Sequence, residues 1–363
     1  MTDQQSEAST PAGDPPGLDC TALRPLLAAL LPSDEAPPLR ARLLSGGRSN
    51  LTYLVECGSK SWVLRRPPLG HVLPTAHDMS REFRILTALA ESAVPVPQPL
   101  LLCTDLSVLG APFYLMDYRR GVVPEGTFPP GMAESPADRR HLSETVIDTL
   151  VDLHAIDWTA CGLDGFGKPE GYLDRQLVRW RRQWDASRNR DLPEVDRLLV
   201  LLERAKPRSG PTTIVHGDFR LGNLMLTNTT PPGIEAVLDW EMSTLGDPLA
   251  DLGWLLIYWG EPGDAHLAGG LDDTMALTAR PGFLTRSQLA ERYSKARGID
   301  VTSTDFYEVF SLLKLAVIAE GIRARFLAGR TVGAGFSGAD VTAALIRRAL
   351  ERADQAADPK LHP

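Results

Sequence analysis

A short run of polar residues follows an apolar stretch in the middle of the chain, where residues 214–223 read IVHGDFRLGN. Asp218 comes after a His-Gly pair, and Asn223 stands five residues further on. In phosphoryl transfer to a hydroxyl, one carboxylate accepts the hydroxyl proton and a nearby carboxamide holds Mg²⁺ on the nucleotide phosphates. The spacing therefore predicts Asp218 as the catalytic carboxylate and Asn223 as a metal ligand.

A second carboxylate, Asp239, stands sixteen residues beyond Asn223 at the end of another apolar stretch. A hairpin through residues 227–233, which are rich in Thr, Pro and Gly, would bring Asp218 and Asp239 side by side. We therefore expect Asp239 to be the second metal ligand. Taken alone, His-Gly-Asp is also typical of a plain turn whose Asp caps the next helix, but the combined spacing favours phosphoryl transfer. His216 is expected to brace the loop.

These residues make the chain similar to the aminoglycoside phosphotransferase and choline kinase group of small-molecule kinases. Within that group it most resembles the kinase-like domain that some proteins carry fused to acyl-CoA dehydrogenases, over about residues 38–355. The resemblance implies an α+β, bilobal, protein-kinase-like fold that uses ATP and Mg²⁺. We expect an N-terminal nucleotide-binding lobe at 18–118, with an antiparallel sheet and one helix. A mostly helical catalytic and acceptor-binding lobe should follow at 119–363. The tail at 1–17 is poor in apolar residues and predicts disorder.

The resemblance also assigns residues that hold the nucleotide phosphates. It places a phosphate-covering loop at the glycine-rich turn, with Gly47, Ser49 and Asn50 as candidates, although the turn taken alone favours an ordinary hairpin. Arg65 occupies the strand position where kinases carry a phosphate-binding lysine. This is a departure from the general pattern, and an arginine binds phosphate through a bidentate fork rather than as a point charge.

Two further nucleotide contacts follow from the resemblance. Glu82 borders the apolar face of an amphipathic helix at 78–89 and would pair with Arg65, although a solvated glutamate fits the spacing equally well. The backbone groups of Asp117 and Arg119 are expected at the hinge, where they would bind the adenine edge.

The second lobe offers candidates for binding the acceptor. The amphipathic segment 172–184 contains four arginines, which either are solvated or face the cleft and bind an anionic acceptor. His154, at the end of a helix at 139–154, is interpreted as a buried structural histidine. Asp247, at a Pro-assisted helix start, should anchor the metal-binding loop from behind. Residues 264–280 suggest a loop, and 304–329 and 340–353 suggest helices.

Composition limits the class of protein. With 363 residues and a formal net charge of −8, the composition argues against nucleic acid as the main partner, because nucleic-acid-binding proteins usually carry a basic surface, but it leaves room for a local basic site. No apolar run is long enough to span a membrane, and the four cysteines are scattered as in reduced cytosolic proteins. We therefore expect a cytoplasmic protein without a nucleic-acid or membrane partner. The resemblance implies an enzyme, monomeric or homodimeric, that acts on a small-molecule hydroxyl.

The identity of the acceptor is left open by the sequence. The arginine-rich segment favours an anionic acceptor such as a hydroxyacyl-CoA, whereas an antibiotic kinase for aminoglycosides or macrolides should be rich in carboxylates there. A non-catalytic nucleotide-binding module is supported only by Arg65. A protein kinase is disfavoured because no Ala-Pro-Glu signature follows Asp239.

Overall fold

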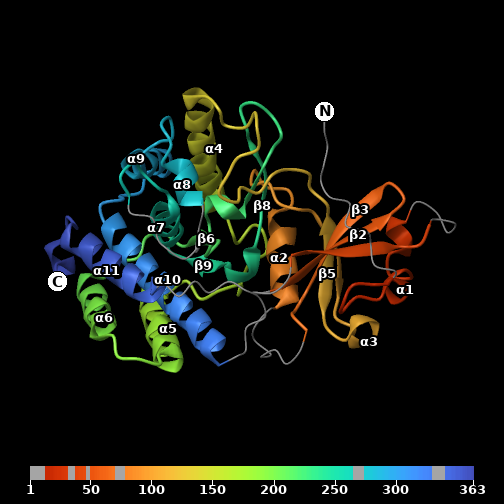
Figure 1. Cartoon of the computed structure of the whole chain (residues 1–363), viewed down its shortest axis with the longest axis horizontal. Helices are drawn as coiled ribbons and strands as arrows, with labels where there is room; N and C mark the ends of the chain where they lie inside the picture. Colours follow the sequence, from red (N-terminus) through yellow and green to blue (C-terminus); the bar gives the residue numbers. More distant parts are fainter. Residues whose placement is uncertain (1–12, 32–36, 46–49, 70–77, 265–273, 329–339) are drawn as a thin grey trace. The chain divides into compact units, whose positions relative to one another are not determined.

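The computed structural model describes residues 13–31, 37–45, 50–69, 78–264, 274–328 and 340–363. Contacts divide the chain into two compact units (Figure 1). Unit 1 comprises the described residues up to Ala90 together with Pro97–Arg119. Unit 2 comprises Glu91–Val96 and Arg120–Pro363. The six-residue segment Glu91–Val96 thus belongs with the C-terminal part of the chain, which the sequence did not predict.

Unit 1 is built on one antiparallel sheet of five strands. Its spatial order is β1 (Arg40–Ser45), β2 (Leu51–Cys57), β3 (Lys60–Arg66), β5 (Phe113–Asp117) and β4 (Pro99–Cys103). Along β2, Tyr53, Val55 and Cys57 alternate onto one face and are buried, as the two-residue period of a strand requires. This sheet agrees with the sheet expected for the first lobe.

The long helix of unit 1 is α2 (Met79–Leu89), which contacts β4 and β5. It begins at Asp78, whose carboxylate accepts a hydrogen bond from the backbone N–H of Arg81 and so satisfies a donor of the first turn. Its buried face carries Met79, Ile85, Leu86 and Leu89, together with the charged residue Glu82. The helix therefore presents a carboxylate to the interior of unit 1.

The N-terminal part of unit 1 differs from expectation. Residues 20–30 form two short pieces, α1 (Cys20–Leu23) and a 3₁₀ turn, Ala28–Leu30, because Pro25 has no N–H with which to continue the first helix. The expected disorder does not extend to residues 16 and 17. The carbonyl of Pro16 accepts from the Tyr53 hydroxyl at 2.6 Å, and the carbonyl of Gly17 accepts from Arg66. Residues 1–12 lie outside the described residues. A short helix, α3 (Leu106–Leu109), lies between β4 and β5 in the sequence.

Unit 2 is mostly helical, and a long buried helix, α10 (Thr304–Leu327), contacts four others (Figure 1). Those four are α5 (Tyr172–Ser187), α6 (Pro193–Ala205), α7 (Leu249–Tyr258) and α11 (Val341–Asp354). Elsewhere, α4 (Pro136–Ala155) packs against α9 (Arg286–Arg297). A short helix, α8 (Thr274–Thr278), lies where a loop was expected at 264–280. A 3₁₀ turn, Pro359–Leu361, contacts α6 near the C-terminus.

Two small antiparallel sheets complete unit 2. In one, β7 (Leu224–Leu226) pairs with β8 (Ile234–Val237) across the predicted hairpin. In the other, β6 (Thr213–Val215) pairs with β9 (Thr244–Gly246). The apolar strand before Asp218 and the apolar strand before Asp239 therefore belong to different sheets and do not pair with each other. No helix in the part of the chain that the structure describes is both long and apolar enough to cross a membrane.

Candidate active site

The loop after β6 turns through Gly217, which lies in the left-handed region with φ at 85°. A Cβ on this residue would lie 2.7 Å from the carbonyl oxygen of Met242, too close for any side chain. The turn therefore requires glycine for its backbone conformation and also for its packing. It sends Asp218 out of the strand direction and into the site.

His216 braces this loop, as the sequence predicted. Its side chain is fully buried. Its Nδ1 accepts a hydrogen bond from the backbone N–H of Asp218 at 3.2 Å, and its Nε2 lies 2.9 Å from the carbonyl oxygen of Leu238. Nε2 must carry the proton in this arrangement, because Nδ1 is the acceptor. The imidazole thereby ties the residue of the predicted base to the residue just before Asp239.

Asp251, on α7, anchors the loop from behind. Its carboxylate accepts hydrogen bonds from the backbone N–H groups of His216 and Gly217 at 2.6 and 2.8 Å, and it lies 3.3 Å from Nε2 of His154. Burial acts to raise the pKa of Asp251, but the hydrogen bonds from His154 and the loop outweigh it and leave the pKa lowered. The carboxylate therefore stays charged and accepts from the loop.

The predicted anchor, Asp247, has a different task. Its carboxylate caps α7 at the N–H of Leu249 and also accepts from Gly210 N and the Tyr307 hydroxyl. It is structural, as expected, but the residue that holds the catalytic loop is Asp251. His154 is buried, as predicted, with its other ring nitrogen 2.8 Å from the hydroxyl of Tyr293.

The carboxylate of Asp218 is held at both oxygens. One oxygen accepts from the indole N–H of Trp254 at 2.6 Å, and the other accepts from the side-chain amide of Asn223 at 2.7 Å. Arg220 lies 3.4 Å from the first oxygen, and the Asp218 side chain retains 23% exposure. A carboxylate fixed in this way is oriented before an acceptor arrives, while its exposure leaves it accessible to a hydroxyl.

The chemistry of Asn223 and Asp239 fits a magnesium ion. Because the amide nitrogen of Asn223 is directed to Asp218, its amide oxygen is the atom that can serve as a ligand. Asp239 supplies a carboxylate, and the N–H of the preceding Leu238 donates to the carbonyl of Asn223 at 2.9 Å. Among the described residues no group of three His, Cys, Asp or Glu is arranged to hold a metal. Two oxygen ligands suit Mg²⁺, which takes its remaining ligands from water and phosphate.

The backbone of Asp239 is unusual. Its φ and ψ are 65° and 67°, in the left-handed region that side chains other than glycine rarely adopt. Asp tolerates this conformation better than most residues, although it still costs free energy. The observed conformation is typical of a residue whose side-chain direction matters more than its local stability.

In unit 1 the buried carboxylate of Glu82 contacts two other predicted nucleotide-binding residues. Glu82 is 2% exposed and accepts from the Asn50 amide at 2.6 Å and from the Tyr114 hydroxyl at 2.8 Å. Arg65 Nε lies 3.5 Å from the same oxygen that binds Tyr114. The structure thus brings Asn50, Arg65 and Glu82 together, and it adds Tyr114. Gly47 and Ser49 lie outside the described residues.

The predicted hinge residues lie at the end of β5. Asp117 pairs with Trp62 of β3, and its backbone N–H donates to the carbonyl of Gln98 at 2.9 Å. Its carboxylate accepts from the Gln98 N–H and lies 2.8 Å from Arg119 Nε. The Asp117 side chain therefore fixes the course of the chain here, and the backbone N–H of Asp117 already donates to Gln98.

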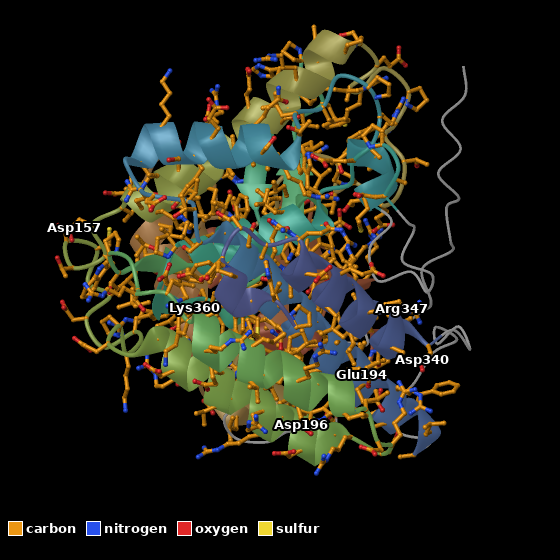
Figure 2. All side chains as sticks on the ribbon, turned by 90° about the vertical axis from the view of Figure 1, so that its left-hand side faces the viewer. Asp157, Glu194, Asp196, Asp340, Arg347 and Lys360 are labelled. Carbon is orange, nitrogen blue, oxygen red and sulfur yellow. The ribbon has the colours of Figure 1, made fainter. Side chains whose placement is uncertain are left out.

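The arginines of α5 do not all serve one purpose. Arg181 lies 3.3 Å from Asp196 of α6, and Figure 2 shows Asp196 on that helix. Arg175, Arg179 and Arg182 recur at helical spacing and line an open groove of about 770 Å³ with Asp174, Gln176, Val178 and Gln183. The structure therefore separates the arginine that pairs with a neighbouring helix from three that share a groove.

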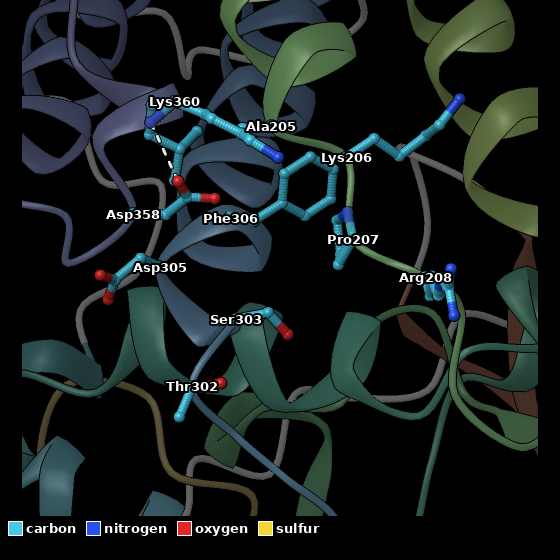
Figure 3. Close-up of a pocket in the computed structure, with 11 residues that line it drawn as sticks. Ala205, Lys206, Pro207, Arg208, Thr302, Ser303, Asp305, Phe306, Asp358 and Lys360 are labelled. Atoms are coloured by element: carbon cyan, nitrogen blue, oxygen red, sulfur yellow. Dashed lines mark hydrogen bonds between the residues drawn. The ribbon is translucent and has the colours of Figure 1, made fainter.

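A second hollow, of about 350 Å³, lies at the start of α10 (Figure 3). Lys206, Arg208 and Lys360 line it together with Asp305 and Asp358. Lys206 is paired with Asp174, and Asp305 with Arg352. None of the described site residues named above lines this hollow, so it is separate from the catalytic loop.

Three residues around the catalytic loop were not predicted as site residues: Asp251, Trp254 and Lys314. Lys314 Nζ donates to the carbonyl of Gly217 at 2.6 Å and lies 3.7 Å from the ring centroid of Trp254. Asp251 begins the largely apolar helical stretch DLGWLLIYW, and Lys314 interrupts the largely apolar stretch FSLLKLAVIA. A charged residue at a buried helical position is the signal that could have identified both.

The chain is similar to proteins of known family over most of its length. The profile of the phosphotransferase enzyme family matches residues 40–282. Mouse acyl-CoA dehydrogenase family member 10 is 36% identical over 314 residues, which are 86% of this chain and 29% of that protein. Chicken acyl-CoA dehydrogenase family member 11 is also 36% identical, over 82% of this chain and 38% of its own length. The chain thus spans well under half of these relatives.

Solved structures show the same fold. A Ralstonia eutropha protein assigned as an aminoglycoside phosphotransferase superposes with a TM-score of 0.71 at 31% identity, over 93% of this chain and 97% of its own. Choline kinase from Cryptosporidium parvum superposes with a TM-score of 0.62 at 12% identity, over 95% and 98%. The second likeness concerns the fold alone. Together they confirm the predicted resemblance and the protein-kinase-like fold class.

Proposed function

The chain belongs to the phosphotransferase enzyme family and is a small-molecule kinase, and from that premise we propose that it uses ATP and Mg²⁺ to phosphorylate a hydroxyl of an anionic metabolite. The observation that carries the proposal is the Asp218 carboxylate. It is fixed at one oxygen by Trp254 and at the other by Asn223, and it remains accessible. This arrangement suits a group that must receive a proton from an oriented hydroxyl.

The roles of the residues in unit 2 follow from their contacts. Asp218 orients the acceptor hydroxyl and takes its proton. The amide oxygen of Asn223 and the carboxylate of Asp239 would hold magnesium, which neutralises charge on the phosphates when it is bound. His216 and Asp251 keep the loop in shape through the hydrogen bonds to its backbone.

In unit 1, Arg65 would bind the nucleotide phosphates, and Glu82 would hold the Arg65 guanidinium in place. A guanidinium offers donors in a planar fork, so it remains able to bind a phosphate oxygen while one nitrogen faces Glu82. Asn50 would steady the end of the phosphate loop through the same carboxylate. The backbone N–H of Asp117 already donates to the carbonyl of Gln98. The adenine contact at this residue would therefore come from the Asp117 carbonyl, with the Arg119 backbone beside it.

The proposal of an anionic acceptor depends on the arginines of α5. Three arginines line its groove, and guanidinium groups recognise phosphate and carboxylate well. Arg179 lines the groove, and its positive charge lowers the pKa of Lys314. Because Lys314 donates to Gly217 in the catalytic loop, the groove and the loop are electrostatically linked. A hydroxyacyl-CoA is one acceptor of this kind, because it joins a hydroxyl to several phosphates.

An antibiotic phosphotransferase is the second candidate. It is favoured by the 31% identity with the Ralstonia eutropha protein assigned as an aminoglycoside phosphotransferase. A cationic antibiotic would require carboxylates in the groove, where Asp174 is the one acidic residue among those lining it and is paired with Lys206. A non-catalytic nucleotide-binding module would need neither an accessible Asp218 nor its two hydrogen-bond donors.

The experiment is a turnover screen of hydroxylated metabolites, CoA esters and antibiotics, followed by Asp218→Asn on the acceptor found. Asparagine preserves the shape but cannot take the proton, so turnover should fall by roughly 10²- to 10⁴-fold. The melting temperature and ATP affinity should change little. Asp354→Asn, at an exposed position at the end of α11, is the matched control. Unchanged turnover in a folded Asp218→Asn protein would refute the catalytic assignment and favour a binding module.

A further inference from the structure

Lys314 lies in the buried part of α10, with 9% of its surface exposed. The residues around it along the helix are apolar, and Leu312, Leu313, Leu315 and Ala316 are all buried. Lysine is almost never buried to this extent without a specific partner, because an ammonium loses much hydration free energy on leaving water. Its presence in this apolar stretch therefore calls for a physical reason.

The contacts of the Lys314 ammonium supply that reason. It donates to the carbonyl oxygen of Gly217 at 2.6 Å, directly before Asp218. It also lies 3.7 Å from the ring centroid of Trp254 and 5.8 Å from that of Trp180. A cation over an indole face is attracted by the ring quadrupole, most strongly when both are shielded from water. The ammonium is thus held between the catalytic loop and two tryptophans.

Both contacts lead to the same carboxylate. Gly217 precedes Asp218 in the chain, and the indole N–H of Trp254 donates to one Asp218 oxygen at 2.6 Å. We propose that Lys314 is a positioning residue for the phosphotransfer reaction: by fixing the Gly217 carbonyl and the Trp254 indole, it sets where the Asp218 carboxylate lies. The proposal rests on the proposed function, because it concerns how well Asp218 performs there.

The charged groups that act on Lys314 come from three elements. Burial lowers its pKa to about 8, against the opposing effect of Asp218 in the loop and Asp251 on α7, while Arg179 on α5 lowers it further. Lys314 is therefore an ammonium at neutral pH and becomes a neutral amine above about pH 8. The amine loses its cation–π attraction, so the positioning contact should weaken with rising pH.

Stability and activity should consequently respond in opposite directions. Because the folded-state pKa lies below the unfolded-state value of 10.5, burial of the ammonium costs stability at neutral pH, and this cost is relieved as the pH rises from about 8 toward 10.5. Lys314→Met fills similar space without charge, so its melting temperature at pH 7 should equal or exceed that of the wild type. A residue with only a structural role would instead lower it.

The test compares Lys314→Met and Lys314→Gln with wild type, with the exposed Lys295→Met as the control. Loss of positioning should lower kcat by about 10- to 10²-fold in Lys314→Met, with acceptor KM little changed. Glutamine keeps a donor for Gly217, so it should recover part of kcat. Wild-type kcat should decline above about pH 8, and both Lys314 variants should lack this decline. Lys295→Met should behave as wild type.

Two kinetic results would overturn the proposal. One is an unchanged kcat and pH profile in Lys314→Met; the other is a raised acceptor KM at unchanged kcat, which would make Lys314 a binding residue. A tryptophan-fluorescence titration without any acceptor separates this question from the proposed function. The wild type should show a transition near pH 8 that shrinks in Trp254→Phe. Absence of that transition would also overturn the proposed role of Lys314. If no acceptor in the screen is phosphorylated, only the proposed function is refuted.

Discussion

Each unit contains a buried carboxylate that binds other residues of that unit, and the two carboxylates bind different kinds of group. In unit 1, Glu82 binds side chains: the Asn50 amide, the Tyr114 hydroxyl and the Arg65 guanidinium. In unit 2, Asp251 binds mainly the backbone, through the N–H groups of His216 and Gly217. Glu82 therefore directs a charge, whereas Asp251 fixes the shape of a loop.

This difference determines how much folding stability is lost when each carboxylate is replaced. A carboxylate that binds side chains can be replaced by another acceptor at moderate cost, because its partners can rotate toward water or another group. A carboxylate that binds buried backbone N–H groups cannot be replaced so easily, because the backbone is fixed and an unpaired buried donor carries its full desolvation cost. Substitutions in the two units should therefore differ in the size of their effects.

Asp251→Ala should lower the free energy of unfolding by about 3–5 kcal/mol, the usual cost of removing one partner from a buried charged network. It leaves two backbone donors and His154 without their acceptor. Urea denaturation, with the exposed Asp354→Ala as control, measures the change. In the wild type, the contribution of Asp251 should persist at neutral pH and be lost only as the pH falls through its lowered pKa, below 3.8. A loss under 1 kcal/mol would contradict the backbone-anchor role.

Asp239→Ala should remove the Mg²⁺-dependent part of the stabilisation by ATP. Binding at a ligand concentration one hundred times Kd stabilises a protein by about 2.7 kcal/mol, so the corresponding thermal shift is measurable. The measurement is a thermal melt with ATP, with and without Mg²⁺, for the variant and for Asp354→Ala. If Asp239→Ala kept the full Mg²⁺-dependent shift, the metal assignment would be wrong.

Arg65→Ala should weaken ATP binding by about 10- to 100-fold, as expected for the loss of a charge-assisted hydrogen bond to phosphate. Arg65→Lys should retain part of the affinity, because the charge remains while the fork is lost. Titration calorimetry measures both, and the melting temperature shows whether burying Glu82 without its cation destabilises unit 1. Unchanged ATP affinity in Arg65→Ala would mean that Arg65 is not a phosphate ligand.

Tyr114→Phe should have the smallest effect, about 1.5 kcal/mol in unfolding free energy, because Glu82 keeps its contacts with Asn50 and Arg65. A double-mutant cycle with Glu82→Gln isolates the interaction of hydroxyl and carboxylate. The two substitutions should be non-additive, since Glu82→Gln removes the negative charge from the acceptor of the hydrogen bond that Tyr114→Phe removes. Additive effects would show that Tyr114 acts through packing rather than through Glu82.

The sequence was sufficient to predict contacts between residues that lie close together in the chain. Asp218 and Asn223 are five residues apart, and the structure joins their side chains directly. The hairpin between Leu226 and Ile234 was also predictable, because its turn residues lie next to each other in the chain. Arg65 and Glu82 could be named together only through the resemblance, and the structure confirms that they pair.

The sequence was not sufficient where a distant side chain acts on the backbone. Asp251 binds N–H groups 34 and 35 residues away, and Lys314 binds a carbonyl 97 residues away. A backbone donor or acceptor has the same chemistry at every position, so nothing in the loop sequence specifies its partner. The pairing of β6 with β9 was missed for the same reason, since short apolar strands do not identify their neighbours.

The assignment of Glu91–Val96 to unit 2 has a practical consequence for recombining genes of this family. Val94 and Val96 are buried, and the carbonyl of Pro95 accepts from the N–H of Val237 at the end of β8. In a chimera made by a single crossover at residue 119, this hexapeptide and β8 would come from different parent proteins. Functional chimeras should therefore require three crossovers, so that the hexapeptide is inherited with the C-terminal part of the chain.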